Sequence, residues 1–251
     1  MKGNRAVLIT GASGHLGSAI ATACADDAWS VAVHYRSAED RAERLVGEIR
    51  KRGGEAIAVQ ADLADEPRGA ERIVAEVIAR FGRLDGLINN SADQTPVAFS
   101  DLDDQDWQQM LAATLLSATR LSSAAIDVFS PGGSIVNISS VEASWAFPNH
   151  AHYAASKAAL ESFTRSLALE LGPRGMRANA IAPGLIERDG LAADWPQGYN
   201  WWKAAAPSRR PVTAGEVAAA AVFLLGARAT GINGVVLPVD GGWSASARAP
   251  F

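Results

Sequence analysis

Short apolar runs alternate with helix-length amphipathic segments along the chain, and this alternation constrains the fold more than any other feature. Strands are predicted at 5–10, 30–35, 55–60, 84–89, 133–139, 176–182 and 234–239. Helices are predicted at 15–26, 38–53, 66–81, 104–129, 151–172 and 213–226. Continuously apolar strands such as 31–33 are typical of a parallel sheet that is buried on both faces. The sequence therefore predicts an α/β fold, with a doubly wound parallel sheet of about seven strands and helices on both faces.

Composition and charge narrow the class of partner. The chain has 251 residues, a net charge of −4 and a pI near 5.6, and its Lys and Arg residues never gather into a long basic run. We expect small-molecule partners rather than nucleic acid, and a single domain over residues 1–251, because no composition break interrupts the pattern. The longest apolar stretch, 217–225, is too short to span a bilayer, so no membrane partner is expected. The lone Cys24 is expected in the core of a cytoplasmic protein.

A glycine-rich turn follows the first predicted strand. Residues 6–9 are apolar, the turn occupies residues 11–17, and an Ala-rich helical pattern follows it. Glycines let the backbone approach a ligand closely, and a helix N-terminus offers N–H groups and partial positive charge to a pyrophosphate. The strand, turn and helix together predict a dinucleotide site in a Rossmann-type sheet. Plain loop chemistry is the alternative interpretation.

Tyr153 and Lys157 are four residues apart in a segment predicted to be helical, so they project from one face. An ammonium beside a phenol favours the phenolate and lowers the tyrosine pKa from about 10 toward the working range of a general acid or base. Ser140 lies just after the fifth predicted strand, and the three residues together predict a proton-transfer site. An ordinary exposed pair on an Ala-rich helix is the alternative.

Six ordered motifs in this chain resemble the short-chain dehydrogenase/reductase family. Within that family the chain looks similar to pteridine reductases and to 3-oxoacyl-carrier-protein reductase-like ketoreductases. The resemblance covers residues 5–243. The motifs are residues 10–17, residues 89–92, Ser140, Tyr153 with Lys157, residues 183–184 and residues 239–242.

The resemblance implies a mechanism. Ser140 would hydrogen-bond the substrate carbonyl oxygen, and Tyr153 would donate a proton to that oxygen. Lys157 would lower the tyrosine pKa and hold ribose hydroxyls of a nicotinamide cofactor, which supplies the hydride. The family's spacing between serine and tyrosine selects Ser140 over Ser139, for which a structural role is expected.

The end of the second predicted strand bears on the choice of cofactor. Tyr35, Arg36 and Ser37 stand where a carboxylate would bind a ribose 2′-hydroxyl, and Arg36 can grip a 2′-phosphate. NADPH is therefore predicted, with a solvated arginine as the alternative. The predicted cofactor residues, including those that the resemblance implies, are Gly11, Ser13, His15, Leu16, Gly17, Tyr35, Arg36, Ser37, Asp62, Leu63, Asn90, Ser91, Ala92, Tyr153, Lys157, Pro183, Gly184 and Ile186. Asp62 has a second interpretation as a helix cap.

Three positions depart from the family pattern. His15 stands where the family has its second turn glycine, although pteridine reductases also carry a large basic residue there. Thr114 replaces the helix asparagine that anchors a water-mediated proton relay, and its side chain has a shorter reach. Arg188 replaces a threonine, and it either grips an acidic or oxygen-rich substrate or faces solvent.

Substrate contacts are expected in a lid over residues 185–212 and in the loop between Ser140 and Tyr153. An aromatic-rich lid favours a flat or bulky apolar substrate and excludes water, and the alternative is that its rings pack the lid onto its own domain. A carboxylate at position 142 can orient an amine, an imine or a ring nitrogen, or it is a solvated loop acid. The candidate substrate residues are Glu142, Trp145, Arg188, Trp195, Trp201 and Trp202.

Two further patterns are interpreted as structural rather than functional. His150 and His152 flank Ala151, but no third ligand stands at a suitable spacing, so no metal site is predicted. The acidic run 101–106 is predicted to cap a helix N-terminus.

The residues and the resemblance together predict an NADPH-dependent reductase acting on a carbonyl of a small or medium-sized, cyclic or aromatic metabolite. A close alternative is reduction of a C=N bond in a pterin-like ring, where Tyr153 would protonate a nitrogen. A non-catalytic NADPH-binding sensor is a distant alternative, because neither Tyr153 nor Lys157 is lost. The resemblance also implies a homotetramer or a homodimer, and the small residues at 154–155 and 158–159 permit close helix contact.

Overall fold

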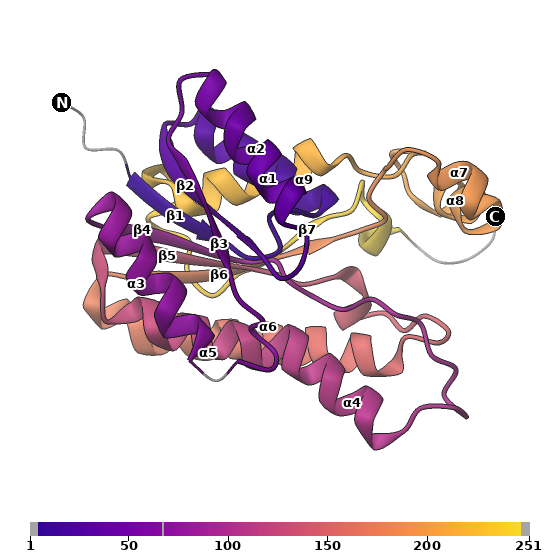
Figure 1. The fold of residues 1–251 in the computed structure, drawn as a ribbon. Coiled ribbons are helices and arrows are strands. Elements are labelled where there is room, and N and C mark those ends of the chain that lie inside the picture. The colour runs from indigo at the N-terminus through magenta and orange to yellow at the C-terminus, as the bar shows by residue number, and fades with distance from the viewer. Residues whose placement is uncertain (1–4, 67, 247–251) are drawn as a thin grey trace.

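Seven parallel strands form one sheet in the computed structural model of the chain, which describes residues 5–66 and 68–246. The strand order is β3-β2-β1-β4-β5-β6-β7, so the winding reverses between β1 and β4 (Figure 1). The strands are β1 (Arg5–Ile9), β2 (Trp29–Tyr35), β3 (Ala56–Gln60), β4 (Leu84–Asn89), β5 (Phe129–Ile138), β6 (Arg177–Pro183) and β7 (Val236–Val239). Every pairing between these strands is parallel, which confirms the predicted doubly wound, Rossmann-type sheet.

Helices cover both faces of this sheet. The helices are α1 (His15–Asp26), α2 (Glu39–Lys51), α3 (Gly69–Phe81), α4 (Asp104–Leu111), α5 (Ser117–Ile126), α6 (Ala151–Leu171), α7 (Leu191–Asp194), α8 (Pro196–Ala205) and α9 (Ala214–Leu225). Figure 1 shows α1, α2 and α9 on one face of the sheet and α3, α5 and α6 on the other. The helices α7 and α8 and the end of α4 project past the carboxyl ends of the strands.

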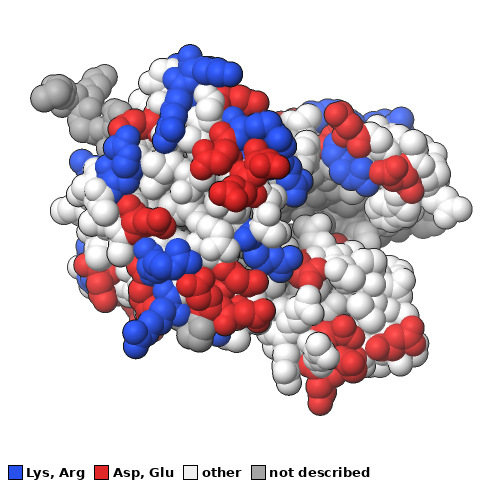
Figure 2. Space-filling view, viewed as in Figure 1, with Lys and Arg blue, Asp and Glu red and all other residues white. Residues whose placement is uncertain are grey.

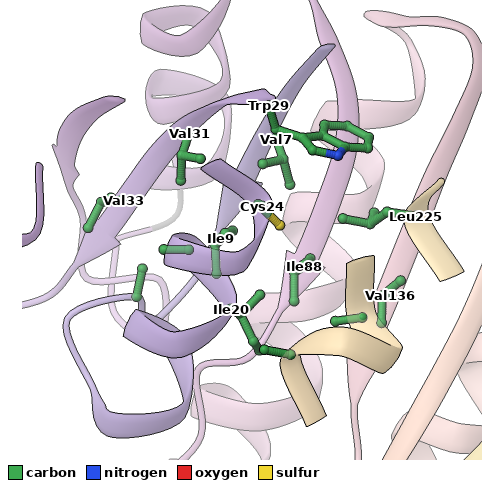
Figure 3. Close-up of a cluster of buried hydrophobic side chains, with 14 of the residues drawn as sticks. Val7, Ile9, Ile20, Cys24, Trp29, Val31, Val33, Ile88, Val136 and Leu225 are labelled. Atoms are coloured by element: carbon green, nitrogen blue, oxygen red, sulfur yellow. The ribbon is translucent and has the colours of Figure 1, made fainter. Parts of the chain in front are cut away.

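An apolar core lies on each face of the sheet. Figure 3 shows part of the first core, in which Ile20 and Cys24 of α1 and Leu225 of α9 face Ile9 and Ile88 of the sheet. Each of these side chains is buried, and burying one such aliphatic side chain stabilises a fold by about 1.5–3 kcal/mol. Burial raises the pKa of the Cys24 thiol, so the prediction that Cys24 is a core residue is confirmed.

Capping residues define the starts of two helices near the site. Asp103 accepts the backbone N–H of Asp106 at 2.9 Å, and the Asp106 carboxylate accepts the N–H of Asp103 at 3.1 Å. The prediction that the acidic run 101–106 caps a helix is therefore confirmed at α4. Thr213 and Glu216 form the same reciprocal pair at the start of α9, where the predicted lid ends.

Two predicted elements differ from the structure. The helix expected over 104–129 is interrupted by a π-helical turn, Ala112–Leu116, which separates α4 from α5, and β5 already begins at Phe129. A π turn adds a residue to one helical turn, a change that a period of 3.6 does not signal. The lid contains two helices that periodicity did not predict, and Pro196 begins α8 at a position where its missing N–H costs nothing.

The surface is hollowed at the carboxyl edge of the sheet. Figure 2 shows this hollow between the part of the molecule that carries α7 and α8 and the part that carries α4. Charged side chains of both signs are interspersed over the face shown. No helix of the described chain is long and apolar enough to cross a membrane.

Candidate active site

Ser140, Tyr153 and Lys157 come from two neighbouring elements and are all buried. Ser140 lies two residues after the end of β5 and is the N-cap of a 3-10 turn, Val141–Ala143. Tyr153 and Lys157 lie one above the other in the first two turns of α6, as their spacing predicts. A hydrogen bond joins the Tyr153 hydroxyl to Ser140, so the strand end and the helix start meet at a hydroxyl pair.

Gln94 is a contact of Tyr153 that sequence reasoning missed. Its side chain lies in the loop after β4 and hydrogen-bonds the Tyr153 hydroxyl. An amide has neither charge nor a motif of its own, and the loop from 90 to 103 has no periodicity that would place it. Only the residue's position after a strand of the predicted sheet pointed to the same edge.

The electrostatics of the pair differ from the prediction. The Lys157 ammonium lies 5.6 Å from the centre of the Tyr153 ring and donates a hydrogen bond to the carbonyl oxygen of Ile138 at 2.7 Å. Burial lowers the pKa of Lys157 to about 7, because the charged form loses hydration. Burial, together with the Glu142 carboxylate, raises the pKa of Tyr153 above its ordinary value. The expectation that Lys157 brings the tyrosine pKa down is therefore wrong for this geometry, and Tyr153 is held as the phenol.

Ser139 and Thr114, the two hydroxyl residues that were not predicted to be catalytic, have structural partners. Ser139 donates to Oε1 of Glu161 at 2.8 Å, in keeping with the structural role expected for it. Thr114 lies buried in the π turn, and its hydroxyl is 3.9 Å from the sulfur of Met110. Thr114 therefore points its hydroxyl along its own helix.

The glycine-rich turn has the shape that a close ligand contact requires. Gly11 has a φ of +60°, a backbone conformation that favours glycine. A Cβ atom on Gly17 would lie 2.3 Å from the carbonyl oxygen of Gly11, so no larger residue fits there. The N-cap of α1 is Gly14, which supplies no side-chain acceptor to the first N–H groups of the helix. Those N–H groups and the helix dipole suit a pyrophosphate, so the residues present fit a dinucleotide cofactor.

Thr10 and Asn90 fasten the turn to the loop after β4. The hydroxyl oxygen of Thr10 accepts the N–H groups of Asn90 and Ser91 at 2.8 and 2.9 Å. The Asn90 side chain donates to the carbonyl oxygen of Thr10 at 2.8 Å. Asn90, predicted as a cofactor residue, thus stabilises the conformation of the glycine-rich turn. The other predicted cofactor residues of these strand ends lie at the same carboxyl edge: Ser13, Leu16, Ser91, Ala92, Pro183, Gly184 and Ile186.

His34 is a second residue whose role the sequence did not reveal. Its Nδ1 atom accepts the N–H of Gly11 at 3.1 Å, so the proton resides on Nε2, which donates to the carbonyl oxygen of Ala61 at 3.1 Å. The ring thereby connects the ends of β1, β2 and β3. Burial lowers its pKa to about 4, so His34 is neutral at physiological pH.

The buried His34 predicts a pH-dependent stability. The pKa of His34 is about 4 in the folded protein against 6.5 for a free histidine, so unfolding takes up a proton between these values. The stability that this ring contributes is present above pH 6.5 and falls by about 3 kcal/mol as the pH drops toward 4. Urea unfolding of the wild type and of His34→Gln over this range measures it. Identical pH profiles in the two proteins would contradict the assignment.

Tyr35 ends β2, and Arg36 and Ser37 follow it at the edge where an adenosine would lie in a doubly wound fold. Arg36 and Ser37 are exposed, and among the described residues the Arg36 guanidinium has no hydrogen-bond or ion-pair partner. The Arg36 carbonyl oxygen accepts from the side chain of Gln60 at 3.0 Å, which fixes the backbone there. Arg36 is thus a positioned, unpaired cation.

Asp62 and Leu63 follow β3 next to this edge. One carboxylate oxygen of Asp62 accepts the N–H groups of Ala64 and Asp65 at 3.1 and 3.3 Å. Asp62 therefore closes the turn that it begins rather than capping α3, whose N-cap is Arg68. Leu63 is buried in the second core.

His15 and Arg188 both line a pocket of about 540 Å³. The Nε2–H of His15 donates to the carbonyl oxygen of Glu187 at 2.8 Å, which fastens the lid to the glycine-rich turn. The Arg188 guanidinium pairs with Asp194 at 2.6 Å and remains half-exposed. This ion pair holds the Arg188 side chain within the lid. The structure therefore does not support the expected contact between Arg188 and a substrate. The pocket borders the turn without reaching Ser140, Tyr153 or Lys157.

The lid tryptophans divide into two groups. Trp202 is 3% exposed, stacks on Trp243 with 4.9 Å between ring centroids, and packs against Gly184. The alternative that lid rings pack onto their own domain therefore holds for Trp202. Trp195 and Trp201 are about half-exposed, and Trp145 is more than a third exposed. These three rings are exposed at the surface of the lid and of the loop after β5.

Phe147 and Trp243 join the rings of Trp145, Trp201 and Trp202 into one network. Phe147 lies edge-on to Trp201 with 5.8 Å between centroids, and Trp145 lies edge-on to Trp243 at 6.3 Å. The loop after β5 and the lid thus share an aromatic contact. Sequence reasoning missed Phe147, although it lies in the loop between Ser140 and Tyr153, and it missed Trp243, which lies outside both predicted regions.

A hydrogen bond joins Glu142 and His150, with 2.8 Å between Oε2 and Nδ1, and it becomes an ion pair when the imidazole is protonated. Glu142 is accordingly neither a free recognition group nor a solvated acid. His152 points elsewhere and is buried edge-on against Trp107. Over residues 5–66 and 68–246, no three His, Cys, Asp or Glu side chains gather in a way that could hold a metal ion.

Comparisons with known proteins agree with this geometry. Residues 11–244 match a family model described as enoyl-(acyl carrier protein) reductase. The chain is 32% identical to a 3-oxoacyl-[acyl-carrier-protein] reductase of Staphylococcus aureus over 96% of this chain and 99% of that protein. It is 35% identical to 1-cyclohexenylcarbonyl-CoA reductase of Streptomyces collinus, over 94% and 86% of the two chains. A short-chain dehydrogenase of Burkholderia cenocepacia, solved in complex with NADP, superposes with a TM-score of 0.89 at 35% identity over 96% and 98%.

Proposed function

The chain belongs to the short-chain dehydrogenase/reductase family, and from this premise we propose that it is an NADPH-dependent reductase in which Tyr153 protonates a substrate carbonyl. The observation that carries the proposal is the hydroxyl pair of Ser140 and Tyr153, with Lys157 one helical turn away. We assign all of residues 1–251 to one NADP-binding domain, with the lid at 185–212.

Each residue of the site has its own role in the proposed reduction. A bound nicotinamide cofactor supplies the hydride. The turn at 11–17 would hold the pyrophosphate through backbone N–H groups, and Lys157 would hold ribose hydroxyls. Ser140 positions the carbonyl oxygen of the substrate by a hydrogen bond, and Tyr153 donates its proton to that oxygen. A tyrosine held as the phenol is the form that this donation consumes.

Arg36 supports NADPH over NADH. Its unpaired guanidinium is free to bind a 2′-phosphate in bidentate fashion, and no carboxylate stands at positions 35–37 to bind a ribose hydroxyl instead. The Burkholderia cenocepacia structure contains NADP, which supports the same choice.

Removing the charge at position 36 is expected to abolish the preference for NADPH. Arg36→Leu should raise the KM for NADPH by about 10- to 100-fold, which corresponds to the binding free energy of a hydrogen bond between charged groups. The KM for NADH should stay nearly constant. The ratio of kcat/KM for the two cofactors measures this. Arg41→Leu, an exposed arginine on the nearby α2, is the matched control. An equal loss with both cofactors would contradict the role of Arg36.

The aromatic residues of the lid and of the loop after β5 support a cyclic or aromatic carbonyl substrate of small or medium size. Trp145 and Trp201 are the exposed rings of this network. The name of the Streptomyces collinus relative describes a cyclic acyl group as its substrate, which supports the same class. Rates of NADPH consumption with a panel of ketones, quinones and dihydropterins test the proposal. Activity with dihydropterins alone would favour reduction of a C=N bond, and no activity with any of them would favour a sensor.

We also propose that the protein is a cytoplasmic homotetramer, or a homodimer, with no nucleic-acid or membrane partner. The free, buried Cys24 fits a reducing compartment. Large apolar side chains that are exposed on the chain, among them Phe99 and Leu169, support association of copies. Light scattering on the purified protein tests this, and a monomeric mass would rule it out.

A further inference from the structure

The turn after β3 presents a hydrogen-bond acceptor and a donor on adjacent residues. One oxygen of the Asp62 carboxylate accepts two backbone N–H groups of the turn, and the other oxygen has no partner among the described residues. The backbone N–H of Leu63 also has no hydrogen-bond acceptor within residues 5–66 and 68–246. An acceptor beside a donor matches one edge of an adenine ring, whose N6 amine donates and whose N1 atom accepts. The two groups therefore support adenine as the part of the cofactor that this turn recognises.

Arg120 holds the backbone of this turn from a distant part of the sequence. It lies in the first turn of α5, and its Nη1 atom donates to the carbonyl oxygens of Leu63 and Ala64, each at 2.9 Å. The side chain is half-buried, and its guanidinium has no carboxylate partner in the part of the chain that the structure describes. Hydrogen bonds from a charged donor are about twice as strong as those from a neutral one. Arg120 therefore restrains the peptide groups on the carboxyl side of Leu63.

The other side of the turn is held by the ends of the strands. The carbonyl oxygen of Ala61 accepts from Nε2 of His34 at 3.1 Å, and the N–H of Ala61 donates to the carbonyl oxygen of Tyr35 at 3.2 Å. The Leu63 side chain is buried in the second core. Residues 61–64 are thus fixed on both sides before a ligand binds, which lowers the entropic cost of binding.

We propose that Arg120 is a positioning residue for adenine recognition. It holds the turn after β3 in the conformation in which the Asp62 carboxylate accepts from the N6 amine and the Leu63 N–H donates to N1. Without Arg120, the carbonyl groups of Leu63 and Ala64 lose their charged donor, and the turn adopts other conformations in which the two groups no longer face one edge of a ring together. The inference rests on the proposed function, because the adenine is that of the NADPH which the reductase would bind.

Two dinucleotides that differ only in the base test this proposal. The reduced form of nicotinamide hypoxanthine dinucleotide phosphate has an oxygen in place of the N6 amine and a proton on N1, so it reverses both hydrogen-bonding partners of the turn. Fluorescence titration gives the Kd of each dinucleotide without any substrate. We expect the wild type to bind NADPH about 10- to 100-fold more tightly than the hypoxanthine analogue, the usual discrimination of a paired donor and acceptor.

Arg120→Leu is expected to lower this preference for adenine to about a tenth of the wild-type ratio. A merely structural role of Arg120 would weaken the binding of both dinucleotides by the same factor and leave the ratio of their Kd values unchanged. An unchanged ratio would overturn the proposal. If Arg120→Leu does not fold, Arg120→Gln is measured instead, because its neutral amide suits a half-buried position but is too short to reach both carbonyl groups.

Arg174→Leu is the matched control. Arg174 donates to the carbonyl oxygen of Ile126 at 2.8 Å, at the opposite end of α5, so this variant should keep the wild-type preference for adenine. Arg120→Lys should also keep it, because a single nitrogen atom of Arg120 makes both bonds and an ammonium has three donors. An equal loss in Arg120→Leu and Arg174→Leu would contradict a specific role of Arg120.

The same titrations separate this proposal from the proposed function. A wild-type protein that binds neither dinucleotide would refute the NADPH-dependent function and, with it, the role of Arg120. A wild type that binds NADPH, but with a preference for adenine that Arg120→Leu retains, would refute the role of Arg120 alone.

Discussion

Replacing Tyr153 by phenylalanine is expected to lower kcat for carbonyl reduction by about 10²- to 10⁴-fold, the usual contribution of a positioned general acid. The phenyl ring fills the same buried volume and keeps its edge contact with His150, but it has no proton to donate and no hydrogen bond to Ser140 or Gln94. Steady-state rates with a saturating ketone and NADPH measure the loss. Unchanged turnover would refute the assignment of Tyr153 as proton donor.

Tyr199→Phe is the matched control for that experiment. Its hydroxyl also makes a side-chain hydrogen bond, which it donates to Glu187, but it lies on the lid. We expect a much smaller loss of turnover than in Tyr153→Phe. Thermal unfolding of both variants shows whether either loss has a structural cause, since neither substitution changes the packed volume of the ring.

Gly17→Ala is expected to destroy the dinucleotide site with a change of one methyl group. The new Cβ would lie 2.3 Å from the Gly11 carbonyl oxygen and 2.7 Å from the Ala12 Cα, and both are backbone atoms that cannot turn aside. Such overpacking costs about 1–3 kcal/mol in stability or opens the turn, and the affinity for NADPH should fall by about tenfold or more. Cofactor titration by fluorescence and urea unfolding measure the two effects.

Gly47→Ala is the matched control for the glycine substitution. Gly47 lies within α2, and a Cβ there would meet nothing within 4 Å. The alanine should stabilise the helix by about 0.5–1 kcal/mol and leave NADPH binding unchanged. If Gly17→Ala bound NADPH as tightly as Gly47→Ala, the turn would not be the cofactor site.

The fold could be predicted from the sequence because apolar residues dominate its buried parallel strands. The runs at 5–10 and 84–89 match β1 and β4 within one residue, since the apolar segments 6–9 and 87–88 mark strands that are buried on both faces. The lid could not be predicted in the same way. Its helix α7 has only four residues, and α8 is short and carries the exposed Trp201, so neither shows the apolar stripe that a period of 3.6 requires.

The candidate site could be predicted where its residues lie close together in the sequence. The four-residue interval between Tyr153 and Lys157 places both on one face of α6, and the structure has them there. The roles of His34 and Gln94 depend on which strand ends become neighbours in space, and spacing within one segment has no information on that. The pKa of Tyr153 depends on burial, which a motif does not report, so its predicted direction was wrong.

The stacked rings of Trp202 and Trp243 have a consequence for access to the site. Burying an indole this completely, with a stacked partner, anchors α8 to the C-terminal segment as firmly as a piece of core. The segment before α8 is held by the bridge between Ile186 and Val212 and by the buried Leu191, and its exposed contacts, such as Arg188 to Asp194, are weak in water. The part of the lid that carries Trp202 is therefore expected to stay in place as a fixed wall beside Gly184.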